Sequence, residues 1–394
     1  MQRLLLGPGP SEVHPRVLAA LGRPTIGHLD PVFLEQLDQV QASLRRVFRT
    51  ENGLTLPISG TGSAGMEACF VNLVEEGDEV IIGINGVFGT RMAEVAARLG
   101  AKVVAAEVSW GDVVSPEAIK AALSRCVRPR LVAIVHAETS TGAWQPVPDI
   151  ASLAHQFGAL LVLDTVTSLG GCPVDIDGWK VDASYSGTQK CLSCPPGLSP
   201  LTFSSQALAR LAERRVKPRS WYFDLSLISG YFGSSRVYHH TAPVNMIFAI
   251  DEALRLVFEE GLDARFERHR ANHRALLAGL ATIDVLPASQ SSERLWMLNS
   301  VLVPKGADDR DIRGRLLSRH GIEIGGGLGP LAGKVWRIGL MGESSRIENV
   351  RRLLACLAIE LGSDRHNDAI DAADHAYEED AGPIALTSGN RPSK

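Results

Sequence analysis

In the first 200 residues, short runs of consecutive apolar residues alternate with segments in which apolar positions recur every three or four residues. The runs predict buried strands and the periodic segments predict helices between them. The expected strands are Glu79–Ile84, Leu131–Val135, Ala159–Leu163 and Ala183–Ser186, and the expected helices include Thr90–Leu99 and Ile150–Phe157. This alternation is typical of a mainly parallel sheet with helices on both faces, in which ligands bind at the carboxyl ends of the strands.

The pattern changes after residue 250, where a smaller α+β domain is expected. Its helices and apolar segments are Ala249–Glu260, Ala264–Leu280, Asn299–Val303, Arg310–His320, Trp336–Met341 and Arg346–Leu361. Beyond residue 361 the chain is polar and acidic, with a short helix expected at Asn367–Glu379 and a disordered end at Pro383–Lys394. We therefore expect an N-terminal segment at residues 1–20, a large domain at 21–255, a small domain at 256–361 and a partly disordered tail at 362–394.

Composition narrows the class of protein. With 45% hydrophobic and 21% charged residues, the 394-residue chain has enough apolar side chains for a sizeable core. Its net charge of −4 and the lack of a basic run argue against a nucleic-acid or membrane-surface role, and no apolar stretch reaches membrane-spanning length. The start, MQRLLLGPGP, does not resemble a signal peptide, and the six cysteines are mostly scattered, so we expect a cytoplasmic protein.

Two short motifs raise the question of metal or redox chemistry. Cys191 and Cys194 form a C-x-x-C, but no second ligand pair is evident and Pro195-Pro196-Gly197 follows where a redox motif would open a helix, so an incidental pair is expected. His239 and His240 are adjacent, and neighbours on a strand point to opposite faces. We expect no metal.

The stretch SGTGSAGMEA places glycines and hydroxyl residues just before a helical pattern. Backbone N–H groups at such a turn, together with the positive end of the helix, suit a phosphate. Thr61, Gly62 and Ser63 are the candidates. Alone, this pattern also fits a plain glycine-rich turn, since it has neither the lysine of a P-loop nor a G-x-G-x-x-G fingerprint.

Asp164 ends an apolar strand, and Lys190 lies in a stretch rich in small and hydroxyl residues, SYSGTQKCLSCPPG. A buried lysine is costly unless it is paired, has a lowered pKa or is modified. A phosphate site, a strand-end aspartate and a buried lysine together suggest pyridoxal phosphate: the lysine forms a Schiff base and the aspartate keeps the pyridine nitrogen protonated. The alternatives are a helix N-cap for Asp164 and an ordinary surface residue for Lys190.

Several segments carry a resemblance to a known family: GPGP, SGTGSAGMEA, HAETSTG, the Asp164 strand, GTQK, YHHT and GGLGPLAGKVWRIG. Together they span nearly the whole chain. The sequence resembles the class V, fold-type I pyridoxal-phosphate aminotransferases of the alanine–glyoxylate, serine–glyoxylate and ureidoglycine–glyoxylate group. That resemblance implies a seven-stranded, mainly parallel sheet in the large domain, a smaller C-terminal α+β domain, and a homodimer with shared active sites whose N-terminal segment packs on the partner.

The resemblance also assigns roles. Lys190 would form the Schiff base and Asp164 would face the pyridine nitrogen. The remaining cofactor-binding residues would be Thr61, Gly62, Ser63, Phe88, Thr139, Val166 and Gln189, with Tyr238 and Thr241 reaching the partner's phosphate, while Arg337, Thr139 and His28 would bind substrate. Arg337 would grip the substrate carboxylate. On the residues alone, Phe88 could instead belong to the core and Arg337 to a surface ion pair.

The expected reaction moves an amino group from a small amino acid to glyoxylate. The sequence as a whole is most similar to the ureidoglycine–glyoxylate branch, but that branch has Gln at the position of His28 and Asn at the position of Tyr238. We therefore expect L-alanine as donor, with L-serine as a further donor and ureidoglycine as the alternative. Two other classes stay open: a class V lyase such as a cysteine desulfurase, and a non-enzymatic phospho-ligand-binding protein.

Overall fold

A seven-stranded sheet forms the centre of the protein in the computed structural model, which describes residues 3–289 and 293–381. The strand order is β2-β10-β9-β8-β5-β3-β4. Only β10 runs antiparallel to its neighbours β2 and β9, and the pairs among the other strands are parallel. The strands are β2 (Leu54–Ser59), β3 (Glu79–Ile84), β4 (Lys102–Glu107), β5 (Pro129–Val135), β8 (Leu160–Asp164), β9 (Ala183–Tyr185) and β10 (Leu198–Phe203). The predicted fold is confirmed, and the expected strands are present.

Alternate residues of the central strands enter separate cores on the two faces of the sheet. In β5, Val132 and Ile134 belong to one hydrophobic cluster, and Leu131 and Ala133 belong to the other. This two-residue period follows from the pleat of a strand, and burial on both faces explains why these strands are continuously apolar. Helices α2 (Pro31–Phe48), α5 (Pro116–Leu123), α6 (Pro148–Gln156) and α9 (Val244–Glu260) cover the first face. Helices α3 (Gly62–Leu73), α4 (Val87–Arg98), α7 (Ser205–Ala212) and α8 (Leu225–Phe232) cover the second.

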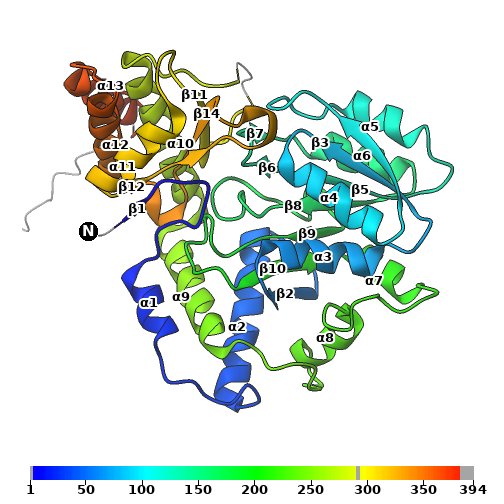
Figure 1. Cartoon of the computed structure of the whole chain (residues 1–394). Coiled ribbons are helices and arrows are strands. Elements are labelled where there is room, and N and C mark those ends of the chain that lie inside the picture. Colours follow the sequence, from blue (N-terminus) through cyan, green and yellow to red (C-terminus); the bar gives the residue numbers. More distant parts are fainter. Residues whose placement is uncertain (1–2, 290–292, 382–394) are drawn as a thin grey trace, which may run out of the picture.

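A smaller unit with its own core lies at the upper left of Figure 1. Its antiparallel sheet has the order β11-β14-β13 and packs around the fully buried Trp336. The strands are β11 (Leu298–Leu302), β13 (Gly325–Gly326) and β14 (Val335–Gly339), and the helices are α10 (Leu262–Thr282), α11 (Asp309–His320), α12 (Ile347–Glu360) and α13 (His366–Ala381).

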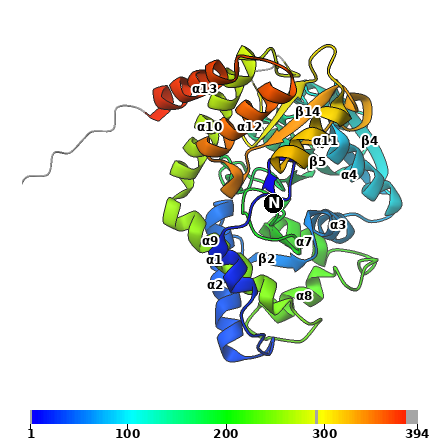
Figure 2. The same cartoon turned by 60° about the vertical axis from the view of Figure 1, so that its left-hand side comes forward.

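Helix α13 is the helix that was expected in the acidic tail. It lies along α10 and α12 in the turned view of Figure 2. It buries Ala369 and Ala373 in the core of the smaller unit. The expected disordered end, Pro383–Lys394, lies outside the described residues.

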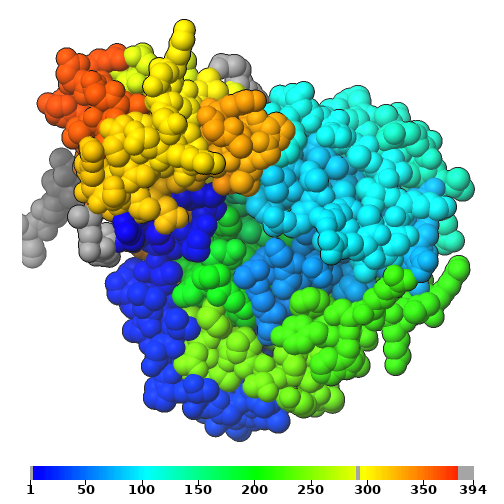
Figure 3. Space-filling view, viewed as in Figure 1, coloured from blue at the N-terminus to red at the C-terminus, as the bar shows by residue number. Residues whose placement is uncertain are grey.

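The N-terminal segment links the two units within one chain. Strand β1 (Leu4–Leu5) pairs in parallel with β12 (Ile322–Glu323) of the smaller unit, and helix α1 (Pro15–Leu21) packs against α9 of the larger one. In Figure 3 this segment, in dark blue, lies below the yellow and orange smaller unit. Remaining short elements are β6 (Ala137–Glu138), β7 (Ala143–Trp144) and the 3-10 turns η1 (Gly329–Leu331) and η2 (Gly342–Ser344).

Candidate active site

A cavity of about 160 Å³ lies where the parallel strands end and brings together nine of the predicted site residues. Asp164 is the last residue of β8, Lys190 follows β9, and the N-terminus of α3 follows β2. The predicted residues that line it are Thr61, Gly62, Ser63, Phe88, Thr139, Asp164, Val166, Gln189 and Lys190. This is the edge at which parallel α/β sheets bind ligands.

Lys190 is 8% exposed and lies under the N-terminal segment. Its Nζ donates a hydrogen bond to the carbonyl oxygen of Pro8, and its own carbonyl accepts one from Ser11 Oγ at 2.7 Å. Gly9 has a φ of +104°, which favours glycine, and a Cβ there would lie 2.8 Å from the Lys190 side chain. Burial lowers the pKa of Lys190 to about 8, and the positive charge of Arg337 acts in the same direction. Lys190 is therefore not a surface residue, and a substantial fraction of its amine is neutral near that pH.

Asp164 holds a buried carboxylate with two hydrogen-bond donors. Oδ1 accepts from the Val166 N–H and Oδ2 accepts from the Tyr185 hydroxyl, each at 2.8 Å. Desolvation raises the pKa of Asp164 from 3.8 to about 6, although both donors act to lower it. No helix of the described chain begins at this residue, so the N-cap alternative is wrong.

The N-terminus of α3 is open toward the cavity. Thr61 is the N-cap, yet within the described chain no side chain hydrogen-bonds to the first N–H groups of this helix. A Cβ on Gly62 would lie 2.8 Å from Val166 Cγ2, so glycine permits close packing there. Gln189 Oε1 is buried without a hydrogen-bond partner among the described residues. Orphaned donors, an orphaned polar atom, a buried lysine and a buried carboxylate in one cavity fit pyridoxal phosphate.

Phe88 is half-buried, lines the cavity and lies at the start of α4, so it is not simply a core residue. Its N–H donates to Glu138 Oε2 at 3.0 Å. Glu138 is fully buried, and its other oxygen accepts from the N–H and Oγ of Ser140 at 3.0 and 2.6 Å. Burial raises the pKa of Glu138. This carboxylate fixes the start of α4, and with it the aromatic side chain at the cavity.

Arg337 lies beside the cavity and does not line it. Its Nε donates to the Gly326 carbonyl at 2.7 Å and its Nη1 to the Thr139 carbonyl at 3.3 Å. The side chain is 7% exposed, and no carboxylate in the described parts of the chain forms an ion pair with it. The surface ion pair is therefore wrong: Arg337 is a buried cation whose positive charge is not neutralised by a salt bridge.

His28, Tyr238 and Thr241 do not line this chain's cavity. His28 and Tyr238 lie against each other, with ring centroids 5.4 Å apart. His28 Nε2 is buried without a partner in the described chain, whereas Tyr238 is 56% exposed and Thr241 is exposed. Two segments far apart in the sequence therefore meet at the positions that the resemblance connected with donor choice.

His239 and His240 do not lie on a strand, so the expectation that they point to opposite faces is wrong. Their Nδ1 atoms are 2.7 Å apart, and His239 stacks on Trp221. Among residues 3–289 and 293–381, no group of three His, Cys, Asp or Glu residues is placed to hold a metal ion. Cys191 and Cys194 are buried free thiols, and burial raises the pKa of each to about 12.

Sequence reasoning missed part of the cavity. The lining residues that it did not name are Met66, Arg91, Val135, Ala137, Thr167 and Tyr185. Arg91 follows Phe88 by three residues, and that spacing alone places both on one helix face. Its guanidinium lies 5.0 Å from the centre of the Phe88 ring. Tyr185 could be connected with Asp164 only through the register of β8 and β9, in which the two residues are partners.

The fold and this cavity define a fold-type I pyridoxal-phosphate-dependent enzyme. The chain belongs to the class V aminotransferases: the family model "Aminotransferase class-V" matches residues 11–342. It is similar to the crystal structure of an alanine–glyoxylate aminotransferase from Nostoc sp., with 50% identity, a TM-score of 0.90 and coverage of 92% of this chain and 96% of that one. It is 41% identical to the (S)-ureidoglycine–glyoxylate transaminase of Bacillus subtilis, with 94% and 92% coverage. It is also 41% identical to the alanine–glyoxylate aminotransferase of Oryctolagus cuniculus, with 90% and 91% coverage.

Proposed function

We propose that this protein is an aminotransferase that moves the amino group of L-alanine to glyoxylate, giving glycine and a 2-oxo acid. The observation that carries the proposal is the cavity in which Lys190, Asp164 and the open N-terminus of α3 meet. Membership of the class V aminotransferases supports the reaction type, and the names of the relatives support glyoxylate as acceptor.

The residues present fit pyridoxal phosphate, and each would have a distinct task. Lys190 would bind its aldehyde carbon, and the N-terminus of α3 with Gln189 would hold its phosphate. When bound, the cofactor supplies an electron sink for the bond-breaking step. Asp164 would keep the ring nitrogen protonated, because its carboxylate is ionised above a pH of about 6.

Lys190 also has the properties of a general base. Its lowered pKa of about 8 leaves a fraction of the amine neutral near physiological pH, and that fraction can take the Cα proton of the donor and return it to the acceptor. Arg337 would orient the substrate through its carboxylate, because a buried guanidinium without an ion-pair partner offers paired donors to such a group. Thr139, whose carbonyl oxygen accepts a hydrogen bond from Arg337, lines the same cavity and would contact substrate and cofactor.

The choice of donor rests on His28 and Tyr238. The sequence resemblance connects amide side chains at these two positions with ureidoglycine, and here both positions carry rings in mutual contact. L-Alanine needs no partner for a ureido group, and L-serine is a further donor on the same grounds. The alternative donor is (S)-ureidoglycine, which the printed name of the Bacillus subtilis relative supports.

The proposed enzyme is a homodimer with shared active sites. The exposed Tyr238 and Thr241 are free to reach a partner's phosphate, as the resemblance implies. The N-terminal segment at residues 1–20 would pack on the partner as well as on its own chain. For the domains we propose boundaries at 21–255 and 256–361, with the tail from residue 362 packing on the small domain through α13. Six free cysteines support a cytoplasmic location. No helix in the described chain has the length and apolar character needed to cross a membrane.

Steady-state rates with L-alanine, L-serine and (S)-ureidoglycine against glyoxylate test the choice of donor. We expect L-alanine to have the highest kcat/KM, and a large preference for ureidoglycine would overturn that choice. A double variant, His28→Gln with Tyr238→Asn, should raise the ureidoglycine rate relative to alanine. Val237→Asn, at the exposed neighbouring position, is the matched control and should leave the ratio unchanged.

Two other classes are tested by the same preparation. The protein should be yellow, and borohydride should fix the cofactor to Lys190; a colourless protein that gains no absorbance band with pyridoxal phosphate would favour a binding protein. A desulfurase needs a mobile, reactive cysteine late in the chain. Cys356 lies within α12, and burial raises the pKa of its thiol, which does not suit that role.

A further inference from the structure

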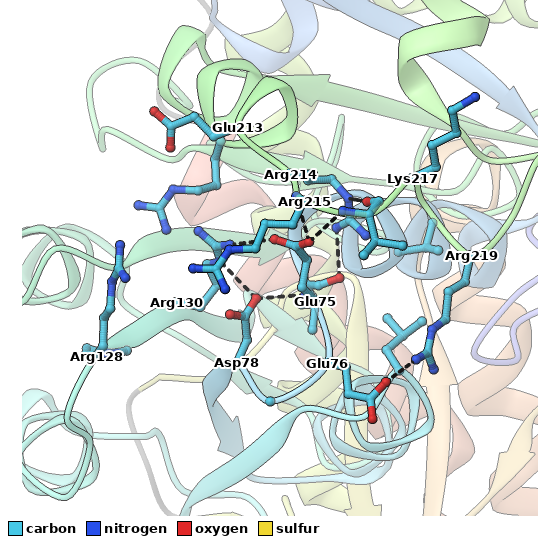
Figure 4. A pocket seen from close by; sticks show the side chains of 17 residues that line it. Glu75, Glu76, Asp78, Arg128, Arg130, Glu213, Arg214, Arg215, Lys217 and Arg219 are labelled. Carbon is cyan, nitrogen blue, oxygen red and sulfur yellow. Dashed lines mark hydrogen bonds and ion pairs between the residues drawn. The ribbon is translucent and has the colours of Figure 1, made fainter.

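A second hollow, of about 460 Å³, lies at the opposite ends of the parallel strands from the active-site cavity. Its wall comes from the residues just before β3, the start of β5, the end of α7 and the loop that follows α7 (Figure 4). The two cavities share no lining residue. Seven cationic side chains line it: Arg128, Arg130, Arg210, Arg214, Arg215, Lys217 and Arg219. The four acidic ones are Glu75, Glu76, Asp78 and Glu213, so three positive charges are in excess although the whole chain carries −4.

Two of the arginines are committed to acids of the wall. Arg130 binds Glu75 at 3.2 Å and Asp78 at 2.9 Å, and Arg219 pairs with Glu76. Figure 4 shows Glu75 at the centre of the cluster. Its other oxygen accepts from the backbone N–H of Arg215 at 3.0 Å. These acids therefore have little capacity left to neutralise further cations.

A third arginine is committed to the backbone. Arg214 donates from Nη1 to the carbonyls of Asn72 and Val74, at 3.0 and 2.9 Å, and from Nε to the carbonyl of Val216 at 3.0 Å. Carbonyl oxygens satisfy its donors without cancelling its charge. Arg214 therefore holds the loop after α7 in place and adds to the positive potential of the hollow.

Four cationic side chains are left over: Arg128, Arg210, Arg215 and Lys217. Arg128 and Arg210 are the two that lie outside the loop after α7. Neither forms an ion pair with an acid in the described chain, and in Figure 4 the guanidinium of Arg128 stands clear of the paired groups. Burial lowers the pKa of Arg210, and the charges of Arg130 and Arg128 act in the same direction, whereas Glu213 and Asp78 act to raise it. Like charges that face a common space are mutually destabilising, and an anion placed between them would relieve the repulsion.

We propose that this hollow binds a small anion with two or more negative charges, such as a phosphate monoester or pyrophosphate, through Arg128 and Arg210. Planar guanidinium groups bind phosphate oxygens in a bidentate manner, and such charge-assisted hydrogen bonds are stronger than neutral ones. The residual positive charge of the wall favours an anion of comparable charge, and the volume admits a small organic phosphate. This site is independent of the reaction proposed above.

Calorimetric titration of the borohydride-reduced holoenzyme with inorganic pyrophosphate tests the proposal. Reduction fixes the cofactor in the first cavity, so the titrant cannot enter the cofactor's own phosphate site. We expect one binding event per chain that weakens as sodium chloride is added. Absence of binding at millimolar pyrophosphate would overturn the proposal. A titration with sodium chloride at equal ionic strength that gives the same heat would overturn it as well.

A variant that combines Arg128→Gln and Arg210→Gln should weaken binding by about tenfold or more, because two charge-assisted contacts are removed. Lys217→Gln is the matched control: Lys217 lines the same hollow, but Figure 4 shows its amine directed away from the cluster. We expect at most about a twofold change there. Equal losses in the two variants would show a diffuse charge effect and refute a site at Arg128 and Arg210. Cofactor absorbance and transamination should be unchanged in both, which separates this result from any failure of the proposed function.

Discussion

Replacing Asp164 with asparagine should make the cofactor-free protein more stable while it disables the enzyme. The carboxylate is fully buried, and desolvation raises its pKa from 3.8 to about 6. At ~1.4 kcal/mol per pH unit, this difference corresponds to a cost of about 3 kcal/mol for the ionised form. An asparagine can accept from the Val166 N–H without that cost.

The effect has a definite pH dependence. Because the folded-state pKa lies above the unfolded one, the stability of the cofactor-free protein should fall as pH rises from about 4 to about 6 and then level off. The Asp164→Asn variant lacks this loss. Its advantage over the wild type should therefore be about 1.6 kcal/mol at pH 5 and about 3 kcal/mol at pH 8.

Urea denaturation of both cofactor-free proteins, at one protomer concentration, measures the difference. Turnover of the holoenzyme should fall by ~10²–10³-fold, because an amide cannot hold the ring nitrogen protonated through a buried ion pair. A variant that is less stable than the wild type at pH 8 would refute the reasoning. It would mean that the Tyr185 and Val166 donors outweigh desolvation.

Four further substitutions test the catalytic lysine, the hydrogen bond to Asp164 and the packing of two glycines. Lys190→Ala should abolish transamination and borohydride attachment but leave non-covalent cofactor binding, so near-normal turnover would remove its assigned role. Tyr185→Phe removes one hydrogen-bond donor from Asp164, so the acid limb of the pH–rate profile should move up by about one pH unit. If the acid limb does not move, the Tyr185 hydroxyl does not control the pKa of Asp164. Gly65→Ala would place a Cβ 2.1 Å from a buried side-chain oxygen and should cost about 1–3 kcal/mol in the free energy of unfolding. Gly314 is exposed in α11 with open space around it, so Gly314→Ala should instead stabilise the protein by about 0.5–1 kcal/mol. Equal melting temperatures for the Gly65→Ala and Gly314→Ala variants would contradict the close packing around Gly65.

The fold was predictable where the sequence pattern reflects burial. After Glu79, strand Glu79–Ile84 has no polar side chain, because helices cover both faces of the sheet, and this pattern is visible in the sequence alone. The antiparallel strand β10 was not anticipated, because its residues carry no mark of direction. The path of the N-terminal segment was equally hidden: its pairing with β12 joins residues more than 300 positions apart.

The site was predictable where one motif carries one role, and less so where a role depends on neighbours. Asp164 and Lys190 could be identified as strand-end and buried-loop residues, but the hydroxyl that holds Asp164 comes from the neighbouring strand and needs the register to be known. The prediction that His239 and His240 point to opposite faces was wrong for a different reason. Their segment is not a strand, so the alternation of strand side chains does not hold there, and their Nδ1 atoms lie 2.7 Å apart.

The energetics of the cavity explain why a buried lysine and a buried aspartate stand together in one chain. Desolvation acts against the charged form of each, lowering the pKa of Lys190 and raising that of Asp164. The Pro8 carbonyl gives Lys190 a neutral partner, which satisfies a donor without cancelling a charge. With pyridoxal phosphate bound, Lys190 would hold its aldehyde carbon and no longer carry a free ammonium group, and Asp164 would face a protonated ring nitrogen. The cofactor would thus offset a destabilisation that the protein alone leaves unrelieved, and its removal should reduce stability more in the wild type than in Asp164→Asn.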